Sequence, residues 1–264
     1  MPMVQAENVS HRFGEADGGL LALDGVSFSV EVGEFISIVG PSGCGKSTLL
    51  RIIAGLRAPT SGHVILDDRR VQGPSDGIGI VFQSPALMPW RTVLGNIELP
   101  VEVKGLGTTA YRQAALQLIA LVGLKGFEGN YPFELSGGMQ QRVALCRALI
   151  CDPPVILMDE PFGALDALTR EQMNLELQRI WLERKKTIVF VTHSIPEAVF
   201  LSDRVLVMTS RPGIIRSTVP VRFPRPRMLR AFQDVEFWRV ADRIRRDLTQ
   251  GQGGMSEAVV DSPE

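Results

Sequence analysis

One stretch of the sequence constrains the fold more than any other: residues 37–56, which read SIVGPSGCGKSTLLRIIAGL. Apolar residues lead into a glycine-rich loop, and the leucines and isoleucines after Ser47 recur at helical spacing. A strand that passes through such a loop directly into a helix is typical of an α/β unit. The letters GPSGCGKS between the two elements match a loop that holds nucleotide phosphates, and the flanking strand and helix are the context that this match requires.

The residues of this loop suit a phosphate chain for separate physical reasons. The glycines let successive backbone N–H groups converge on phosphate oxygens, Lys46 supplies a point charge, and the Ser47 hydroxyl can ligate Mg²⁺. The alternative is a glycine-rich turn that arose by chance, and the flanking elements argue against it. We predict a phosphate site formed by Gly40, Pro41, Ser42, Gly43, Cys44, Gly45, Lys46, Ser47 and Thr48.

Other segments continue the alternation of strand and helix. GIGIVF before Gln83, PVILM before Asp159 and TIVFVT before His193 are short apolar runs rich in β-branched residues, which is typical of buried parallel strands. Residues 26–39, VSFSVEVGEFISIV, predict two strands joined by a turn at Gly33. Amphipathic helices are predicted between the later runs.

The domain organisation follows from where this alternation breaks. Residues 88–152 carry mostly helical signals, which predicts a helical lobe inserted in the core. We predict one domain over residues 1–250 and a disordered tail over 251–264, GQGGMSEAVVDSPE. The fold class that we predict is α/β: a phosphate-loop NTPase core with a mainly parallel sheet, an antiparallel β subdomain and an inserted helical subdomain.

Composition excludes several other classes of protein. The 264 residues carry a formal net charge of −1 and their 28 Lys and Arg residues are scattered, so we expect no nucleic-acid partner. Three cysteines without metal-ligand spacing fit a reducing compartment better than a disulfide framework or a zinc site. The N-terminus lacks the pattern of a signal peptide, and no run of about 18 apolar residues predicts a membrane span. We therefore expect a cytosolic location and a membrane role only through a partner.

Two further motifs carry chemistry. In PVILMDEP, an apolar strand delivers Asp159 towards a Mg²⁺ shell and Glu160 towards a water in line with the γ-phosphate. In ELSGGMQQR, Ser136 and the two following glycines precede a run of apolar residues at helical spacing. Ser136 could be an ordinary N-cap. Alternatively, the bare backbone N–H groups at this helix start receive a large anion.

The order and approximate spacing of these motifs resemble those of ATP-binding-cassette (ABC) ATPases. The resemblance rests on the phosphate loop, Gln83, LSGGMQQR, VILMDEP, the ALD of residues 164–166, and His193, and it extends from about Val9 to Arg211. LSGGMQQR is the most specific motif, because other phosphate-loop families such as kinases and GTPases lack it. The resemblance implies that the chain binds ATP and Mg²⁺ and hydrolyses ATP.

The resemblance also implies a role for single residues of the site. Gln83 would touch Mg²⁺ and the attacking water, and Asp159 would be a further Mg²⁺ ligand. Glu160 would be the general base, and His193 would contact the γ-phosphate. Phe13 would stack on adenine where Tyr or Trp is more usual, and a packing role in the core is an equal alternative for it. The expected catalytic residues are Lys46, Gln83, Glu160 and His193.

A third implication concerns a second copy of the chain. Two subunits of this family pair head to tail, so that the helix start at Ser136, Gly137 and Gly138 would face the γ-phosphate held by Lys46 of the other copy. Asp166 would cross the dimer interface. The anion expected at ELSGG is then the partner's ATP.

The family contains several functional classes, and a transporter subunit fits best. DNA-repair members carry zinc modules or long coiled coils and translation factors carry two cassettes, whereas this chain has each motif once. The segments SPALMPWRTVLGNIELPVEV and SDRVLVMTSRPG are similar to those of importers of nitrate, taurine, aliphatic sulfonates and pyrimidine precursors. Such importers use permease subunits and a solute-binding protein, which places this chain at the cytoplasmic face of the inner membrane. Alternatives are a non-transport ATPase of another cytosolic machine and, less favoured, a nucleotide sensor without turnover.

The sequence leaves three smaller questions. Leu87, Met88 and Trp90 are expected to line a groove for a short helix of the permease, and a core role under a loop is the alternative. Cys44 at a helix start would favour the thiolate and be open to thiol reagents, although a small residue that is simply tolerated is the preferred interpretation. His11 and His63 have no comparable context, and we assign them no role.

Overall fold

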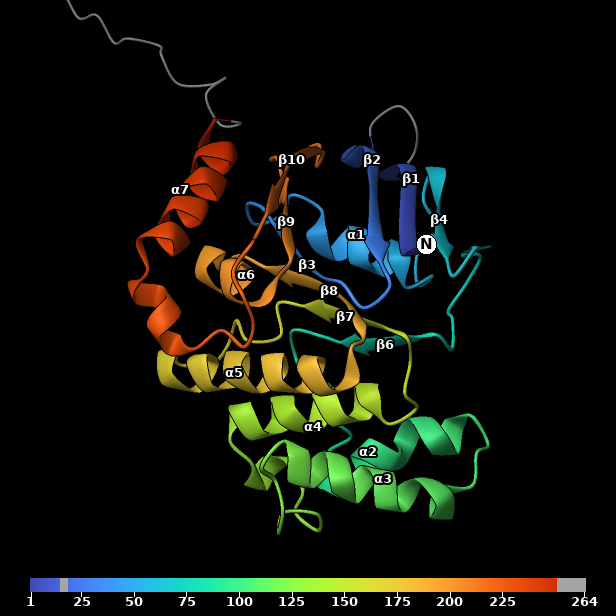
Figure 1. Cartoon of the computed structure of the whole chain (residues 1–264). Coiled ribbons are helices and arrows are strands. Elements are labelled where there is room, and N and C mark those ends of the chain that lie inside the picture. The colour runs from blue at the N-terminus through green and yellow to red at the C-terminus, as the bar shows by residue number, and fades with distance from the viewer. Residues whose placement is uncertain (15–18, 251–264) are drawn as a thin grey trace, which may run out of the picture.

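The computed structural model describes residues 1–14 and 19–250, which fold into two sheets with helices between and around them (Figure 1). The tail for which the sequence predicts disorder, 251–264, lies outside the described residues. One sheet is antiparallel with the strand order β2-β1-β4-β5 among the described residues. Its strands are β1 (Pro2–Phe13), β2 (Leu20–Glu31), β4 (Ser61–Leu66) and β5 (Arg69–Arg70).

The second sheet is mainly parallel, with the order β10-β9-β3-β8-β7-β6, and its edge strand β10 pairs antiparallel with β9. Its strands are β3 (Phe35–Val39), β6 (Ile78–Val81), β7 (Val155–Asp159), β8 (Thr187–Thr192), β9 (Arg204–Met208) and β10 (Ile215–Pro220). The strands β3, β7 and β8 are buried along their whole length, so they read as continuous apolar runs rather than alternating ones. The predicted α/β class is confirmed.

The two strands predicted in residues 26–39 form, but they belong to different sheets. β2 ends at Glu31 in the antiparallel sheet, and β3 begins at Phe35 in the parallel one. Gly33 turns the chain with a φ of 73°, and its N–H donates to Thr187 Oγ1 over 3.0 Å. The turn therefore connects two layers instead of closing a hairpin.

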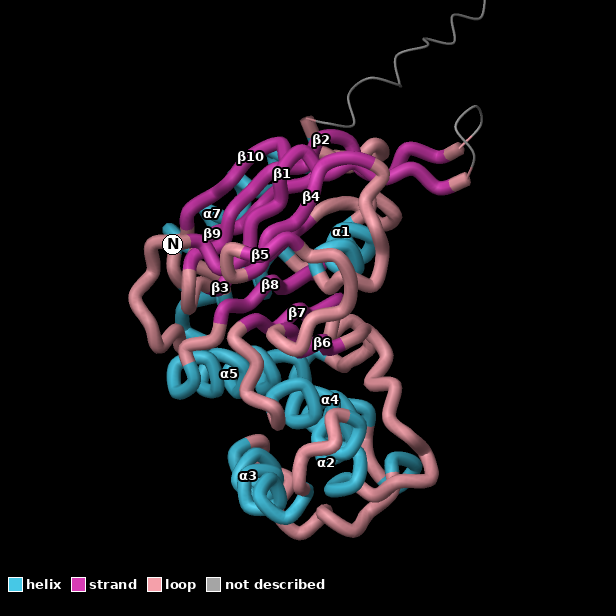
Figure 2. The backbone as a smooth tube through the Cα atoms, turned by 90° about the vertical axis from the view of Figure 1, so that its right-hand side faces the viewer, coloured by secondary structure: helices cyan, strands magenta, loops and turns pink. Residues whose placement is uncertain are grey.

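The helix that follows the phosphate loop, α1 (Lys46–Ile53), lies between the two sheets (Figure 2). Its residues Leu49, Leu50 and Ile53 pack in one cluster with Val9 of the antiparallel sheet and Ile38 of the parallel sheet. Burial on both sides fixes the position of the loop at the start of α1 relative to both sheets.

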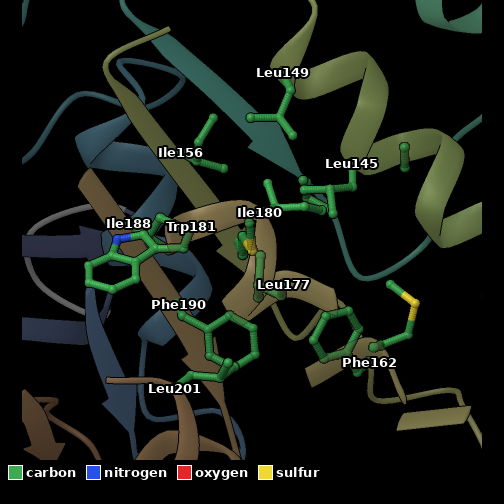
Figure 3. Packing of buried hydrophobic residues seen from close by; sticks show 14 of the residues in the cluster. Leu145, Leu149, Ile156, Phe162, Leu177, Ile180, Trp181, Ile188, Phe190 and Leu201 are labelled. Atoms are coloured by element: carbon green, nitrogen blue, oxygen red, sulfur yellow. The ribbon is translucent and has the colours of Figure 1, made fainter. Parts of the chain in front are cut away.

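The other face of the parallel sheet is covered by helices of the C-terminal half. Phe190 of the sheet packs with Leu177 and Trp181 in a second cluster (Figure 3). Phe35 belongs to the same cluster. The ring of Trp181 meets that of Phe35 edge to face, with centroids 6.3 Å apart. The helices on this side are α5 (Ala167–Arg184), α6 (Ile195–Leu201), the 3₁₀ turn Leu229–Gln233 and α7 (Val235–Thr249).

Residues 88–152 form helices that stand below the sheet in Figure 1, as the helical signals predicted. They are α2 (Val93–Val103), α3 (Thr108–Leu121), the 3₁₀ turn Pro132–Glu134 and α4 (Gly137–Leu149). α4 packs against α5 and β6, and α2 and α3 pack on α4. We keep the division into one domain over 1–250 with this inserted lobe as a proposal. Among the described helices, none combines the length and the apolar character needed to cross a bilayer.

Candidate active site

A cavity of about 340 Å³ lies where the phosphate loop meets the ends of β1 and β2 and the residues that follow β6 and β7. Parallel strands β3, β6 and β7 end at the same edge of the sheet, which is where α/β folds place their ligands. The residues that line the cavity are Phe13, Leu20, Ala22, Ser42, Gly43, Gly45, Lys46, Ser47, Thr48, Gln83, Glu160 and Arg211. Half of the residues that the sequence assigned to the site line this cavity, and Asp159 and His193 adjoin it through hydrogen bonds to Ser47 and Glu160.

The conformation of the loop depends on its glycines. Gly45 has a φ of 104°, which disfavours any residue with a side chain, and a Cβ there would lie 2.7 Å from Leu23 Cδ2 and 3.0 Å from the carbonyl oxygen of Ala22. Gly43 also has a positive φ, 73°. The loop therefore packs closely against β2 at Gly45.

Lys46 is buried at the first position of α1 and points back into the loop. Its Nζ donates to the carbonyl oxygens of Gly40 and Pro41, at 2.9 and 3.1 Å, and lies 3.7 Å from Glu160 Oε1. An ammonium group with its three donors in this place is a compact positive charge at the cavity wall.

A hydroxyl and a carboxylate meet beside Lys46. Ser47 Oγ donates to Asp159 Oδ1 over 2.8 Å, and Asp159 is 8% exposed. Burial raises the pKa of Asp159 above its ordinary value, while the hydrogen bond from Ser47 and the charges of Arg51 and Lys46 act in the opposite direction. The hydroxyl of Ser47, the carboxylate of Asp159 and the amide of Gln83 supply hard oxygen donors of the kind that Mg²⁺ prefers, so these residues fit a magnesium ion.

Glu160 stands between a lysine and a histidine. Its Oε2 lies 3.2 Å from His193 Nδ1, and its Oε1 faces Lys46 at 3.7 Å. The Glu160 backbone adopts a φ of 44°, an uncommon conformation for a residue with a side chain, held by a 2.9 Å hydrogen bond from its N–H to the carbonyl of Val191. This conformation aims the carboxylate into the cavity at the end of β7.

Phe13 lines the cavity and is 36% exposed, so it is not a core residue. The Arg57 guanidinium lies over its ring, 4.8 Å from the centroid, and the His11 ring meets it edge to face with centroids 4.6 Å apart. Neither Arg57 nor His11 lines the cavity. The sequence assigned nothing to these two residues, because only the fold brings residue 57 next to residue 13.

The helix start at ELSGG and Asp166 lie outside this cavity. Ser136 caps α4 by accepting the N–H of Met139 at 3.3 Å, as the ordinary N-cap interpretation expects. The N–H groups of Gly137 and Gly138 have no acceptor among the described residues. A Cβ on Gly138 would lie 2.6 Å from Thr169 Cγ2, so this glycine also permits close packing of α4 on α5.

Asp166 is the N-cap of α5, and Thr169 donates to it from both its N–H and its hydroxyl. The side-chain hydrogen bond from Thr169, followed by that of its backbone, lowers the pKa of Asp166. Neither Asp166 nor Ser136 is among the residues that line the cavity beside Lys46.

Three residues of the predicted phosphate loop are not among those that line the cavity. Gly40, Pro41 and Cys44 belong to the phosphate loop but do not line the cavity. Cys44 is 1% exposed, and burial raises the pKa of its thiol. The expectation of a thiolate open to reagents is therefore wrong, because desolvation outweighs the nearby charge of Lys46.

The cavity also contains residues that the sequence did not single out. Leu20 and Ala22 come from β2, and Arg211 comes from the turn between β9 and β10. The stretch SDRVLVMTSRPG was noted as a whole, but nothing in it marks Arg211 as a neighbour of the phosphate loop.

Comparison with known proteins agrees with this geometry. Residues 23–163 match the pattern that defines the family described as ABC transporter. The chain is 49% identical over 244 residues to an uncharacterized ABC transporter ATP-binding protein of Methanocaldococcus jannaschii, covering 92% of this chain and 91% of that protein. It is 44% identical over 224 residues to the aliphatic sulfonates import ATP-binding protein SsuB of Bacillus cereus, covering 85% of this chain and 88% of that protein.

Among solved structures, one similar protein is a dimeric ATP-binding cassette in a post-hydrolysis state, bound to ADP and Pi. The TM-score is 0.74 at 36% sequence identity, and the alignment covers 84% of this chain and 100% of that one. A second dimeric structure of the same bacterial ABC transporter cassette aligns equally well.

Proposed function

The chain belongs to the ABC transporter family as an ATP-binding ATPase subunit, and we propose that it drives the import of a small solute through a membrane permease. The observation that supports ATP hydrolysis, the reaction proposed to drive this import, is the position of Glu160 between Lys46 and His193 at the wall of the cavity. We propose the class of solute from the similarity to the aliphatic sulfonate import protein. The candidates are nitrate, a sulfonate, taurine and a pyrimidine precursor.

Different residues at the cavity bind the phosphates, neutralise their charge and hold Mg²⁺. The loop from Ser42 to Thr48 holds the phosphates of ATP, and Lys46 neutralises charge that builds up on the transferred group. Ser47, Asp159 and Gln83 would hold Mg²⁺, which when bound neutralises phosphate oxygens. These residues therefore position the phosphate chain before any bond is broken.

Glu160 and His193 act on the attacking water. The Glu160 carboxylate accepts a proton from the water as general base. His193 lies 3.2 Å from Glu160 through Nδ1 and keeps the carboxylate oriented towards the cavity. Phe13 offers a ring for the adenine at the opposite end of the nucleotide, where Leu20 and Ala22 complete an apolar wall.

A second copy of the chain completes the site in this proposal. The exposed helix start at Ser136 and Gly137 has backbone N–H groups and the positive end of a helix dipole, which suit a γ-phosphate. It lies outside the cavity of its own chain, so it serves the ATP of a partner. The dimeric cassette among the similar solved structures supports a dimer here.

The permease is proposed to dock on an apolar cavity beside the segment that follows Gln83. This cavity of about 540 Å³ is lined by Phe82, Met88 and Leu99 together with residues of β6 and α4. Asn96, which is fully buried, accepts the N–H of Met88 at 2.7 Å and donates to the carbonyls of Met88, Arg91 and Thr92 at 3.0–3.1 Å. The segment is thus held rigidly between the nucleotide site and the helical lobe.

The expectation for the three apolar residues of this segment is only partly right. Met88 lines the cavity, Leu87 packs against the core, and Trp90 is 72% exposed without lining the cavity. The groove is therefore formed by Met88 and its neighbours from α2 and α4. Trp90 remains an exposed aromatic anchor close to it in the chain.

The importer proposal is tested in a strain that lacks this chain. We expect uptake of labelled taurine, an alkanesulfonate or nitrate to be restored by the wild-type chain and not by Lys46→Ala. The chain is then purified from membranes, and we expect an apolar permease subunit to co-purify with it. Such an association would place the chain at the cytoplasmic face of the membrane. Restoration of none of these uptake activities, combined with recovery of a different cytosolic machine, would contradict the importer and favour the alternative ATPase.

A further inference from the structure

Arg211 reaches the nucleotide cavity from the turn between β9 and β10. Its Nε donates to the carbonyl oxygen of Gly43 over 2.8 Å, and the side chain lines the cavity together with Phe13 and Ser42. The contact joins residues that are 168 positions apart in the chain. No role in the hydrolysis described above uses this guanidinium.

The turn that carries Arg211 is fixed in place. Thr209 receives the N–H of Ile214 on its hydroxyl at 3.2 Å, and the N–H of Gly213 donates to the carbonyl of Ala22 at 2.9 Å. A Cβ on Gly213 would lie 2.1 Å from the carbonyl oxygen of Cys44. The turn is therefore packed directly against the phosphate loop and β2, and Arg211 is held at the cavity rather than extended freely into solvent.

The contact with Gly43 uses only part of the guanidinium. Arginine has five N–H donors in a planar fork, and one of them binds Gly43. An idealised Cβ on Gly43 would lie 2.7 Å from Arg211 Nη2, so the glycine also makes room for the guanidinium. Within residues 1–14 and 19–250, no carboxylate oxygen lies within 4.0 Å of Arg211.

We propose that Arg211 is a further nucleotide-binding residue, which donates from its Nη groups to phosphate oxygens of ATP while its Nε holds the Gly43 carbonyl. A guanidinium pairs with phosphate through parallel, charge-assisted hydrogen bonds. The bond to Gly43 orients the fork before the ligand arrives, which reduces the entropy lost on binding. This inference rests on the proposed nucleotide site, to which it adds a second cation beside Lys46.

The test compares Arg211→Gln with Arg216→Gln, a loss of the same charge at an exposed position of β10 that does not line the cavity. Affinities for Mg-ATP, ADP and adenosine are measured by equilibrium dialysis. We expect Arg211→Gln to lower the affinities for ATP and ADP about tenfold, as the loss of a charge-assisted hydrogen bond predicts. Adenosine binding and the affinities of Arg216→Gln stay at the wild-type values.

Equal ATP affinity in Arg211→Gln and wild type overturns the inference, and so does an equal loss for adenosine. If Arg211→Gln lowers the melting temperature without nucleotide, Arg211→Lys decides the matter. Partial recovery of ATP affinity by the lysine, which keeps the charge but not the parallel hydrogen bonds, supports a contact with phosphate. A loss of adenosine affinity as large as the loss of ATP affinity in both variants shows that Arg211 only supports the loop. Wild-type protein that hydrolyses ATP but drives no uptake contradicts the proposed importer and leaves this inference standing.

Discussion

Ser47 Oγ donates a 2.8 Å hydrogen bond to Asp159 Oδ1, although 112 positions separate the two residues in the chain. Ser47 lies in the first turn of α1 and Asp159 is the last residue of β7. The parallel sheet brings them together because β3, which leads into the loop, and β7 both pair with β8 and end at the same edge. The fold thus brings together two residues from distant motifs that we propose as Mg²⁺ ligands.

Asp159→Asn should stabilise the folded state and weaken the binding of Mg²⁺. Burial raises the pKa of Asp159, so the folded state holds its proton to higher pH than the unfolded state does. Ionisation of Asp159 therefore destabilises the fold as pH rises through this raised pKa, and asparagine removes that cost. We expect the variant to melt a few degrees higher than wild type at pH 8, with a smaller difference near the ordinary pKa of an aspartate, about pH 4, by scanning fluorimetry without nucleotide.

The same variant should lose the stabilisation that Mg²⁺ adds to ATP binding, since a carboxylate ligand is gone. A melting temperature equal to wild type at both pH values would contradict the burial cost. Retention of the full Mg²⁺ effect would contradict the role of Asp159 as a ligand.

Glu160→Gln should bind ATP as wild type does and hydrolyse it at least about 100-fold more slowly, because the amide keeps the shape but cannot accept the proton. With Mg-ATP, the variant should accumulate as a dimer in light scattering. Glu236→Gln, which changes an exposed acid on α7, is the matched control and should behave as wild type. A Glu160→Gln protein that stays monomeric with Mg-ATP at high concentration would count against the dimer.

The head-to-tail arrangement predicts that Ser136 and Lys46 act in one site from different chains. In a mixed pair with Ser136→Arg on one chain and Lys46→Ala on the other, both defects fall in one site and the second site is intact. We expect about half of the wild-type hydrolysis if the sites act independently. In the second pair, one chain carries both changes and its partner is wild type. Each site then contains one defect, and hydrolysis should be lower than in the first pair. Equal activities of the two pairs would remove support for the arrangement.

Thiol labelling should follow burial rather than position in the loop. Cys44 and Cys146 are buried and Cys151 is half-buried at the wall of the 540 Å³ cavity, so maleimide should label Cys151 first. Burial raises the pKa of Cys151, which lowers its thiolate fraction at pH 7, and the rate should rise about tenfold per pH unit below that pKa. Mass spectrometry of labelled peptides checks this, with Cys151→Ser as the control. Preferential labelling of Cys44 would contradict the burial found here.

The permease groove predicts different outcomes for two neighbouring residues. Trp90→Glu changes an exposed side chain, so the isolated subunit should fold, bind ATP and keep its basal hydrolysis while solute uptake is abolished. Leu87→Glu places a charge against the core and should lower the melting temperature strongly. Undiminished uptake with Trp90→Glu would show that this residue contributes nothing to docking. A large loss of stability in Trp90→Glu would show that it belongs to the core.

The sequence was sufficient to predict the family, the α/β class and part of the lining of the nucleotide cavity, including Lys46, Ser47 and Glu160. It could do so because the phosphate loop between strand and helix and the acids that follow an apolar strand are local patterns. Lys46 and Ser47 are fixed by the backbone of α1, and Glu160 by the end of β7, so their neighbours in the chain already position them. Parallel strands that end at one edge then bring such motifs together in any fold of this class.

The other side chains of that cavity became evident only from the packing of the whole chain. Arg211 meets Gly43, and Arg57 lies over Phe13, through contacts between residues that are far apart in the chain and that no local pattern marks. Cys44 lies within the phosphate loop, yet it does not line the cavity and its thiol is buried. The physical reason is that a motif fixes the path of the backbone, whereas burial, charge and contact of each side chain depend on what the whole chain packs around it.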